Sequence, residues 1–335
     1  MSEQEFSSVS DEIEAIEIKY DNRFVKDILK KKLPILKPIL KWVGGKTQIL
    51  DTLISEFPVE INNYHESFLG GGSVLLAVLT YVKSGIIKIN GTIRAYDLNS
   101  SLIGLYKNIQ SRPDEFYECL QDIINNFNDC EDGGVVNRKP TNYEEAKQSK
   151  ENYYYWVRSQ YNLLTIEEKQ SIIGSAYFSF MNKTCFRGVF RVGPNGFNVP
   201  YGHNKNPEII NKEHLMAVHN LIQGVIFKCC SFTESLLNLE EHDYVYLDPP
   251  YAPETVTSFV KYTEDGFSFE THKKLFQMID AITKNKIKLM MSNSSVSFVL
   301  DYFNNYYTVS HISCKRRINS KNPNAETIEV IIKNY

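Results

Sequence analysis

One short segment restricts the fold of this chain more than any other: an apolar run that ends abruptly in an acid and two prolines. Residues 243–247 have the pattern of a buried strand, and Asp248-Pro249-Pro250-Tyr251 follows directly. Consecutive prolines fix φ and remove backbone donors, so the strand cannot continue. In open α/β sheets, ligands bind outside the carboxyl ends of the strands. We therefore predict a rigid binding loop, called the DPPY loop (residues 248–251), at a strand end.

The chemistry of the DPPY loop favours recognition of an amino group. The Asp248 carboxylate and the Pro249 carbonyl are neighbouring acceptors, and Pro250 contributes no amide donor beside them. Tyr251 adds a flat ring on which a base can stack. A Pro-Pro pair is often only a turn. Its position after a buried strand favours a functional site here.

A second pattern, upstream, is typical of the start of a doubly wound α/β sheet. Residues 64–68 form a candidate strand that enters a run of glycines at 70–72, and Ser73 is placed to cap the helix that follows. Residues 92–96 form the next candidate strand, which ends at Asp97. An acid at such a strand tip can accept hydrogen bonds from both hydroxyls of a ribose.

The α/β pattern is interrupted and later resumes. Residues 102–219 are polar, aromatic and mostly helical, whereas Val225–Cys229 and 287–291 are again strand-like. A helix is predicted over 269–282, and an antiparallel pair over 306–314 and 327–333. The pattern predicts an insertion into one sheet domain. The predicted units are an N-terminal arm (1–32), a catalytic domain (33–103 and 220–335) and an inserted domain (104–219).

The composition excludes several classes of protein. Hydrophobic residues make up 42% of 335, which excludes disorder over most of the chain. No apolar run reaches the roughly 18 residues of a membrane span, and the acidic start lacks a signal-peptide pattern, so we expect a cytoplasmic protein. Six cysteines without a CxxC pair favour a reduced interior with neither disulfides nor metal. With a net charge of −3, binding to nucleic acid would depend on local basic clusters.

Two nucleotide-binding motifs are matched only in part. Gly44-Gly45-Lys46-Thr47 is similar to the end of a phosphate-binding P-loop, but Leu40 stands where that motif needs its first glycine. Residues 70–72 fail as a dinucleotide fingerprint because its third glycine would fall at Leu75. A weaker requirement is met, since glycines after a first strand let a ligand approach the backbone and a helix N-terminus.

Several segments, in their order along the chain, resemble the Dam-type DNA adenine-N6 methyltransferases. They are residues 41–46, 68–73, 97–99 and 248–251, and residues 197–202, 315–317 and 329–335 are similar to the same family. Each motif is weak alone, but the order is highly specific. The resemblance implies a Rossmann-like α/β methyltransferase sheet that uses S-adenosylmethionine, with an inserted, mostly helical DNA-recognition domain containing a β-hairpin. It also implies methylation of N6 of adenine in double-stranded DNA.

The resemblance assigns residues to S-adenosylmethionine. They are Trp42, Lys46, Phe68, Gly70, Gly72, Asp97, Phe232 and Asp248. Trp42 and Lys46 would contact the cofactor, the glycine loop would pass its methionine part, and Asp97 would hold the ribose. Phe232 would lie against the adenine, and Asp248 near both the methionine amine and the target amine. One departure is visible: Ser67 stands where many members have proline, which leaves the role of Glu66 open.

A mechanism follows from these residue types. The adenine amine is a poor nucleophile because its lone pair is delocalised into the ring. In a base flipped out of the duplex, Asp248 and the Pro249 carbonyl would accept its two N–H bonds while Tyr251 stacks on the ring. The nitrogen would then attack the methyl group in line, without a covalent enzyme intermediate or a metal. Pro250 completes the catalytic segment.

The inserted region carries the candidates for reading DNA. Two aromatic and β-branched runs around Gly193-Pro194-Asn195-Gly196 predict a hairpin. In the family that this chain resembles, an arginine of this ribbon reads a base and a neighbouring apolar residue packs on a thymine methyl, and Arg191 and Val189 match these by position. Lys183 would contact a phosphate. The alternative is that Arg187 and Arg191 contact phosphates only. The full set of candidates is Lys183, Arg187, Val189, Arg191, Asn198, Arg316 and Arg317.

Alternatives remain open. A cytosine-N4 methyltransferase shares the geometry but usually has serine at position 248. A cytosine-C5 methyltransferase needs a cysteine nucleophile, usually next to proline, and none of the six cysteines here follows a proline. Glutamine or RNA methyltransferases usually begin this tetrapeptide with asparagine. A non-catalytic DNA-binding module would be expected to have lost Asp248 or the glycines. The resemblance fits a short palindrome such as GATC, a companion restriction endonuclease, and a monomer or weak dimer on DNA.

Overall fold

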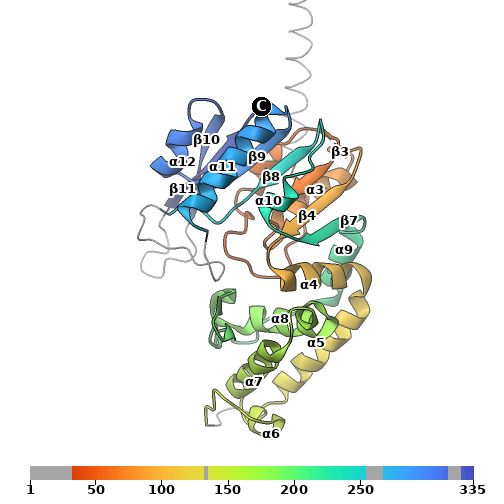
Figure 1. The fold of residues 1–335 in the computed structure, drawn as a ribbon. Helices are drawn as coiled ribbons and strands as arrows, with labels where there is room; N and C mark the ends of the chain where they lie inside the picture. Colours follow the sequence, from red (N-terminus) through yellow and green to blue (C-terminus); the bar gives the residue numbers. More distant parts are fainter. Residues whose placement is uncertain (1–31, 132–134, 254–266, 316–325) are drawn as a thin grey trace, which may run out of the picture.

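The computed structural model describes residues 32–131, 135–253, 267–315 and 326–335. The predicted N-terminal arm lies outside the described residues except for Lys32, and Arg316 and Arg317 lie outside them as well. Figure 1 shows an upper half built around a sheet and a lower half built of helices.

A seven-stranded sheet in the order β10-β11-β9-β8-β2-β4-β7 forms the centre of the upper half. Its strands are β2 (Tyr64–Glu66), β4 (Ile93–Asp97), β7 (Val225–Cys229), β8 (Tyr244–Leu247), β9 (Lys288–Ser294), β10 (Thr308–Lys315) and β11 (Glu326–Lys333). Strand β11 runs antiparallel to both β9 and β10, and the other neighbouring pairs are parallel. The mostly parallel α/β sheet and its terminal antiparallel pair are thus confirmed.

The strand order creates a switch point between β2 and β8. From β2 the chain continues to β4 and β7 on one side of the sheet, then returns to β8 on the other. Tyr64 of β2 pairs with both Ile93 of β4 and Tyr244 of β8. The glycine loop after β2 and the DPPY loop after β8 therefore emerge from adjacent strand ends, where α/β sheets bind ligands.

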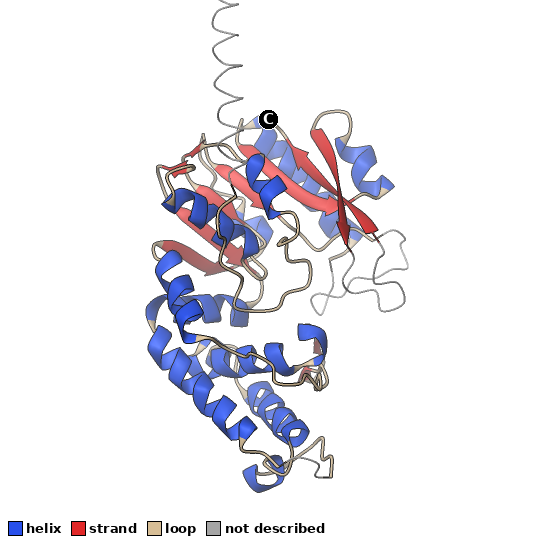
Figure 2. Cartoon of the chain, turned by 180° about the vertical axis from the view of Figure 1, so that it is seen from behind, coloured by secondary structure: helices blue, strands red, loops and turns tan. Residues whose placement is uncertain are grey.

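Helices cover both faces of the sheet, as Figure 2 shows from behind. They are α2 (Leu50–Ser55), α3 (Ser73–Lys83), α4 (Ser100–Ser111), α9 (Lys212–Leu221), α10 (Phe232–Ser235), α11 (Phe269–Lys284) and α12 (Ser297–Phe303). Alternate residues of β8 face opposite sides: Tyr244 and Tyr246 join the core around α3 and α4, whereas Val245 and Leu247 join the core around α11. This alternation is the two-residue period of a strand buried on both faces. A short pair, β1 (Glu60–Ile61) with β3 (Lys88–Ile89), lies outside the main sheet.

The lower half is helical, as predicted for the middle of the chain. It contains α5 (Pro113–Asn128), α6 (Tyr143–Ala146), α7 (Lys150–Leu163), η1 (Glu168–Gln170), α8 (Ile172–Thr184) and η2 (Phe186–Gly188). Strands β5 (Val192–Gly193) and β6 (Gly196–Phe197) form the predicted hairpin, with Val192 paired to Phe197 and Gly193 paired to Gly196. Asn162 of α7 fastens the hairpin, because its side chain accepts from Phe197 N at 2.8 Å and donates to Phe197 O at 3.0 Å.

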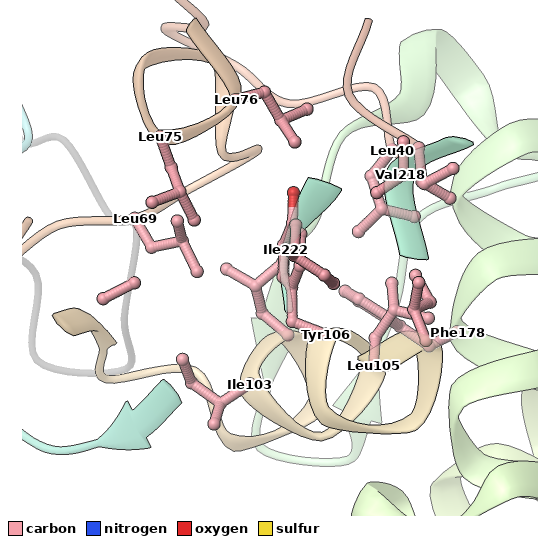
Figure 3. Close-up of a cluster of buried hydrophobic side chains, with 14 of the residues drawn as sticks. Leu40, Leu69, Leu75, Leu76, Ile103, Leu105, Tyr106, Phe178, Val218 and Ile222 are labelled. Carbon is pink, nitrogen blue, oxygen red and sulfur yellow. The ribbon is translucent and has the colours of Figure 1, made fainter. Parts of the chain in front are cut away.

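One continuous hydrophobic core joins the two halves. Figure 3 shows Leu75 and Leu76 of α3 facing Ile103, Leu105 and Tyr106 of α4, with Val218, Ile222 and Phe178 beside them. In the part of the chain that the structure describes, no helix is both long and apolar enough to cross a membrane.

The expected capping role of Ser73 is wrong. Gly72 occupies the N-cap position of α3 with φ of 76°, and Ser73 is the first helical residue. The Ser73 hydroxyl instead accepts a hydrogen bond from the Lys46 amide at 3.1 Å. A glycine is needed at the cap because a Cβ on Gly72 would overlap the Tyr106 hydroxyl and because L side chains disfavour positive φ.

Candidate active site

The carboxylate of the DPPY loop is paired with a lysine from a distant part of the chain. Asp248 Oδ2 lies 2.6 Å from Lys46 Nζ, which also donates to Gly44 O at 2.7 Å. The Lys46 side chain is 3% exposed and that of Asp248 is 19% exposed. Burial raises the pKa of Asp248 to about 6, and the charge of Lys46 acts against this rise. Asp248 is therefore an ionised acceptor at neutral pH.

Tyr251 is held by groups on two sides. Its hydroxyl donates to Glu329 Oε2 of β11 at 2.6 Å, and Lys46 Nζ lies 4.9 Å from the centre of its ring. Burial and the nearby carboxylates raise the pKa of Tyr251 well above its usual value, so the phenol stays protonated. Glu329 was not among the site residues predicted from the sequence. The available signal was its place at the start of the segment 329–335, which resembles the family.

Two residues that were not predicted from the sequence fix the backbone of the DPPY loop and of Ala252, which follows it. His272 of α11 is buried, with Nε2 3.0 Å from Pro250 O and Nδ1 2.9 Å from Ser268 O. Burial lowers the pKa of His272. Asn293 Oδ1 of β9 accepts from Ala252 N at 3.1 Å. These contacts depend on packing between elements distant in the sequence, so no local sequence pattern predicts them.

The glycine loop passes closely over its neighbours. Gly70 and Gly72 both have positive φ, and a Cβ on Gly70 would lie 3.0 Å from Trp42 Cδ1. Asp97 at the end of β4 accepts from Gly70 N and Asn99 N, each at 2.9 Å. Burial raises the pKa of Asp97. The acid predicted at the strand tip thus anchors the glycine loop.

Aromatic side chains complete the site. Phe68 stacks with Phe232 at 5.8 Å between ring centres, and Phe267 packs against both rings. Trp42 lies against the glycine loop and stacks with Phe190 of the helical half at 5.9 Å. The structure therefore groups Phe68, Phe232 and Phe267 in one aromatic cluster.

Glu66 lies behind the site. It is 2% exposed and accepts from the Tyr64 hydroxyl at 2.7 Å. Burial raises its pKa to about 8. A carboxyl group with this pKa is largely protonated at neutral pH, so Glu66 adds little negative charge beside Asp248, whose pKa Lys46 lowers and Glu329 raises. This gives a structural account of the position that the sequence left open.

Those candidates for DNA contact that the structure describes lie in the helical half. Arg191 is exposed, and its Nε donates to Asn198 Oδ1 at 2.6 Å. Val189 is half-buried against the core, and Arg187 is exposed with φ of 57°. Lys183 is half-buried rather than fully exposed, and burial together with the charge of Lys41 lowers its pKa.

No group of three or more His, Cys, Asp or Glu side chains that could hold a metal ion occurs among the described residues. The polar groups around the switch point between β2 and β8 include the Asp97 and Asp248 carboxylates, backbone groups, the Tyr251 hydroxyl and Lys46. Such a set suits a ligand with amino and hydroxyl groups.

Comparison with known proteins agrees with this arrangement. Residues 42–318 match the family described as D12 class N6 adenine-specific DNA methyltransferase. The chain is 32% identical over 312 residues to the Type II methyltransferase M.MjaIII of Methanocaldococcus jannaschii, covering 90% of this chain and 99% of that protein. It is 28% identical over 314 residues to the Type II methyltransferase M1.LlaDCHI of Lactococcus lactis, covering 92% and 99%.

A third similar protein is the DNA adenine methylase of Haemophilus influenzae, 30% identical over 285 residues that cover 83% of this chain and 86% of that one. Residues 42–318, which match the family, include the Lys46–Asp248 pair, the glycine loop and the DPPY loop. This chain belongs to the D12 class of N6 adenine-specific DNA methyltransferases.

Proposed function

We propose that the DPPY loop is the catalytic centre of this adenine methyltransferase and that the switch point holds S-adenosylmethionine, which the family generally uses. The observation that carries the proposal is the half-buried Asp248 carboxylate, ionised beside the buried Lys46 at the end of β8, on the strand next to β2 and its glycine loop. A flipped adenine would present its amine to Asp248 Oδ1 and to the Pro249 carbonyl.

The residues around the switch point suit S-adenosylmethionine chemically. A carboxylate offers about four acceptor sites, more than the backbone contacts of Asp97 use, so it can still accept from a ribose hydroxyl. Phe68 and Phe232 provide aromatic faces for a purine, and Gly70 and Gly72 leave space where a Cβ would collide. Trp42 and Lys46 would flank the same site. When bound, S-adenosylmethionine supplies an electrophilic methyl group on a sulfonium centre.

The chain's own residues would activate and orient the adenine amine. Asp248 and the Pro249 carbonyl accept its N–H bonds, which favours a pyramidal nitrogen with an available lone pair. Tyr251 stacks on the base, and Pro249 and Pro250 keep the acceptors in place because φ is fixed. Holding both reactants in line supplies much of the rate acceleration.

We assign DNA recognition to the inserted region, residues 104–219, and catalysis to residues 33–103 and 220–335. Support comes from the separate helical half in Figure 1 and from the exposed Arg191 at its hairpin. Arg191 is proposed to read a base, with Asn198 and Val189 beside it. Lys183 and Arg187 are proposed to contact the backbone of DNA. Arg316 and Arg317, which lie outside the described residues, are proposed as further contacts.

The partner is proposed to be a short palindromic duplex site such as GATC, bound by a monomer or weak dimer. Two of the similar proteins are named Type II methyltransferases, which supports a companion restriction endonuclease for this chain too. This assignment concerns biological context and is separate from the chemistry of the site.

The decisive experiment measures transfer of labelled methyl from S-adenosylmethionine to unmethylated duplex DNA, followed by hydrolysis and identification of the modified base. N6-methyladenine is expected, whereas N4-methylcytosine would contradict the proposal. Asp248→Ala is expected to abolish transfer yet to bind duplex DNA nearly as well, because phosphate contacts supply most of the affinity. Transfer at the wild-type rate by this variant would rule out the role given to Asp248.

A further inference from the structure

The hydrogen bond from Tyr251 to Glu329 joins the DPPY loop to a strand that is not its neighbour. In the sheet, β9 lies between β8 and β11. Tyr251 thus reaches past the end of β9 to donate to Glu329 Oε2 at 2.6 Å. Glu329 itself pairs in register with Ser294, the last residue of β9. Ser294 Oγ in turn donates to Ala252 O at 2.7 Å, so the exit of the loop and its aromatic ring are anchored to adjacent points of the sheet.

A tyrosine held in this way has little freedom left. Its ring turns about two side-chain torsions, and a hydroxyl anchored on a β-strand restrains both. Lys46 Nζ lies 4.9 Å from the ring centre, which adds a second restraint of the cation–π kind. A ring fixed before the base arrives loses less conformational entropy when the base stacks on it.

We propose that Glu329 is a positioning residue for methylation: it holds Tyr251 in the orientation in which the flipped adenine stacks and is presented to Asp248. This proposal rests on the stacking role proposed above for Tyr251. Glu329 acts through Tyr251 and contacts neither reactant.

Several titratable groups surround Glu329, so the effect of its charge on Asp248 can be measured. Tyr251 and Tyr246 face it from the DPPY loop and β8, and Cys314 faces it from β10. Asp248 and Lys46 complete the charged groups of the cluster, with Glu66 behind them. The negative charge of Glu329 raises the pKa of Asp248. A variant without that charge should therefore keep Asp248 ionised at lower pH.

A double-mutant cycle tests the proposal. Tyr251→Phe removes the hydroxyl and keeps the ring, and Glu329→Ala removes the acceptor. Each change is expected to slow single-turnover methylation roughly tenfold, the order expected for a lost hydrogen bond to a charged group. The double variant should be no slower than the slower single variant because both changes remove one bond. Losses that multiply would overturn the proposal.

A second measurement separates positioning from general structural damage. With 2-aminopurine in place of the target adenine, Glu329→Ala should show brighter fluorescence when bound to duplex DNA, because stacking on Tyr251 is weakened. Its affinity for S-adenosylmethionine should be unchanged by calorimetric titration. Glu270→Gln is a matched control, since Glu270 is exposed and pairs only with Lys273 among the contacts of the described residues. Equal fluorescence for Glu329→Ala and the wild type would contradict the proposal.

Glu329→Gln decides the matter if the alanine variant fails to fold. An amide oxygen still accepts from Tyr251, so the rate well above the pKa of Asp248 should stay within roughly threefold of wild type. The acid limb of the pH profile should move to lower pH because the charge of Glu329 is gone. A rate as low as that of Tyr251→Phe would overturn the proposal. A wild-type enzyme that methylates no adenine would instead disprove the proposed function. An active wild type matched by Glu329→Ala would disprove only the role of Glu329.

Discussion

Lys46 Nζ lies 2.6 Å from Asp248 Oδ2, although 202 positions separate the two residues in the chain. The pair is largely shielded from water, with Lys46 3% exposed. In such surroundings an unpaired carboxylate is costly, so the lysine determines how easily Asp248 remains ionised. The same nitrogen lies over the ring of Tyr251. One cation therefore influences both the acceptor and the stacking surface proposed for catalysis.

The first prediction is that Lys46→Ala changes the pH dependence of methylation. Because Lys46 lowers the pKa of Asp248 from the value that burial alone would impose, its loss should raise that pKa above about 6. Asp248 must be ionised to accept from the amine, so the acid limb of kcat should move to higher pH. Turnover near pH 7 should fall roughly tenfold and recover in part near pH 9.

Lys88→Ala is the matched control, because it removes a lysine from an exposed pair with Glu60 and should leave the pH profile unchanged. An acid limb at the wild-type position in Lys46→Ala would show that Lys46 does not tune Asp248. Lys46→Ala should also lower the affinity for S-adenosylmethionine in a calorimetric titration. ATP with Mg²⁺ should not raise the melting temperature, as it would for a P-loop.

The second prediction concerns Asp97. Asp97→Ala removes a charged acceptor proposed for the ribose, each such hydrogen bond contributing about 1.5–3 kcal/mol. Affinity for S-adenosylmethionine should fall at least tenfold in a calorimetric titration. Because Asp97 also accepts from Gly70 N and Asn99 N, stability should fall as well. Asp97→Asn keeps one acceptor oxygen and should lose less of both, and an unchanged affinity in Asp97→Ala would remove it from the site.

The third prediction uses two glycines with almost the same backbone conformation. Gly72 has φ of 76° and a Cβ there would overlap the Tyr106 hydroxyl, whereas Gly85 has φ of 74° with no atom within 4 Å of such a Cβ. Gly72→Ala should therefore destabilise the fold by roughly 2–4 kcal/mol, and Gly85→Ala by only about 1 kcal/mol. Denaturant unfolding measures both. Equal losses would show that the Tyr106 contact adds nothing.

The fourth prediction separates a base reader from a phosphate contact. Arg191→Ala should relax discrimination at one base pair by about 1–3 kcal/mol. Lys183→Ala should weaken binding to all DNA sequences alike and make binding less dependent on salt concentration. Methylation of single-base variants of the preferred site measures both. In the free protein Arg191 is bonded to Asn198, so Asn198→Ala should also alter discrimination. Uniform loss in Arg191→Ala, with discrimination kept, would contradict the assignment.

Much of the sheet could be predicted because its signals are local. Val225–Cys229 forms a strand with the bounds that the pattern predicted. The strand before the DPPY loop ends at Leu247 because proline cannot continue it. The glycines after β2 and the acid after β4 mark strand ends for similar reasons. The order of these motifs was enough to indicate an adenine methyltransferase.

The partners within the site could not be predicted in this way. Lys46 was expected to contact the cofactor, and the structure shows it bonded to Asp248. Ser73 was expected to cap α3, but the contact of Tyr106 with the glycine loop places Gly72 there. Glu329 becomes the acceptor for Tyr251 only because β9 and β11 pair in one register.

The sequence by itself therefore determined the strand ends, the loops and the family, since proline, glycine and apolar alternation act on the backbone over a few residues. Only the tertiary structure decided which charges meet. The pairing of Lys46 with Asp248 and of Tyr251 with Glu329 depends on strand order and helix packing. Strand order and helix packing arise from burial of the whole core. No single segment of the sequence contains that information.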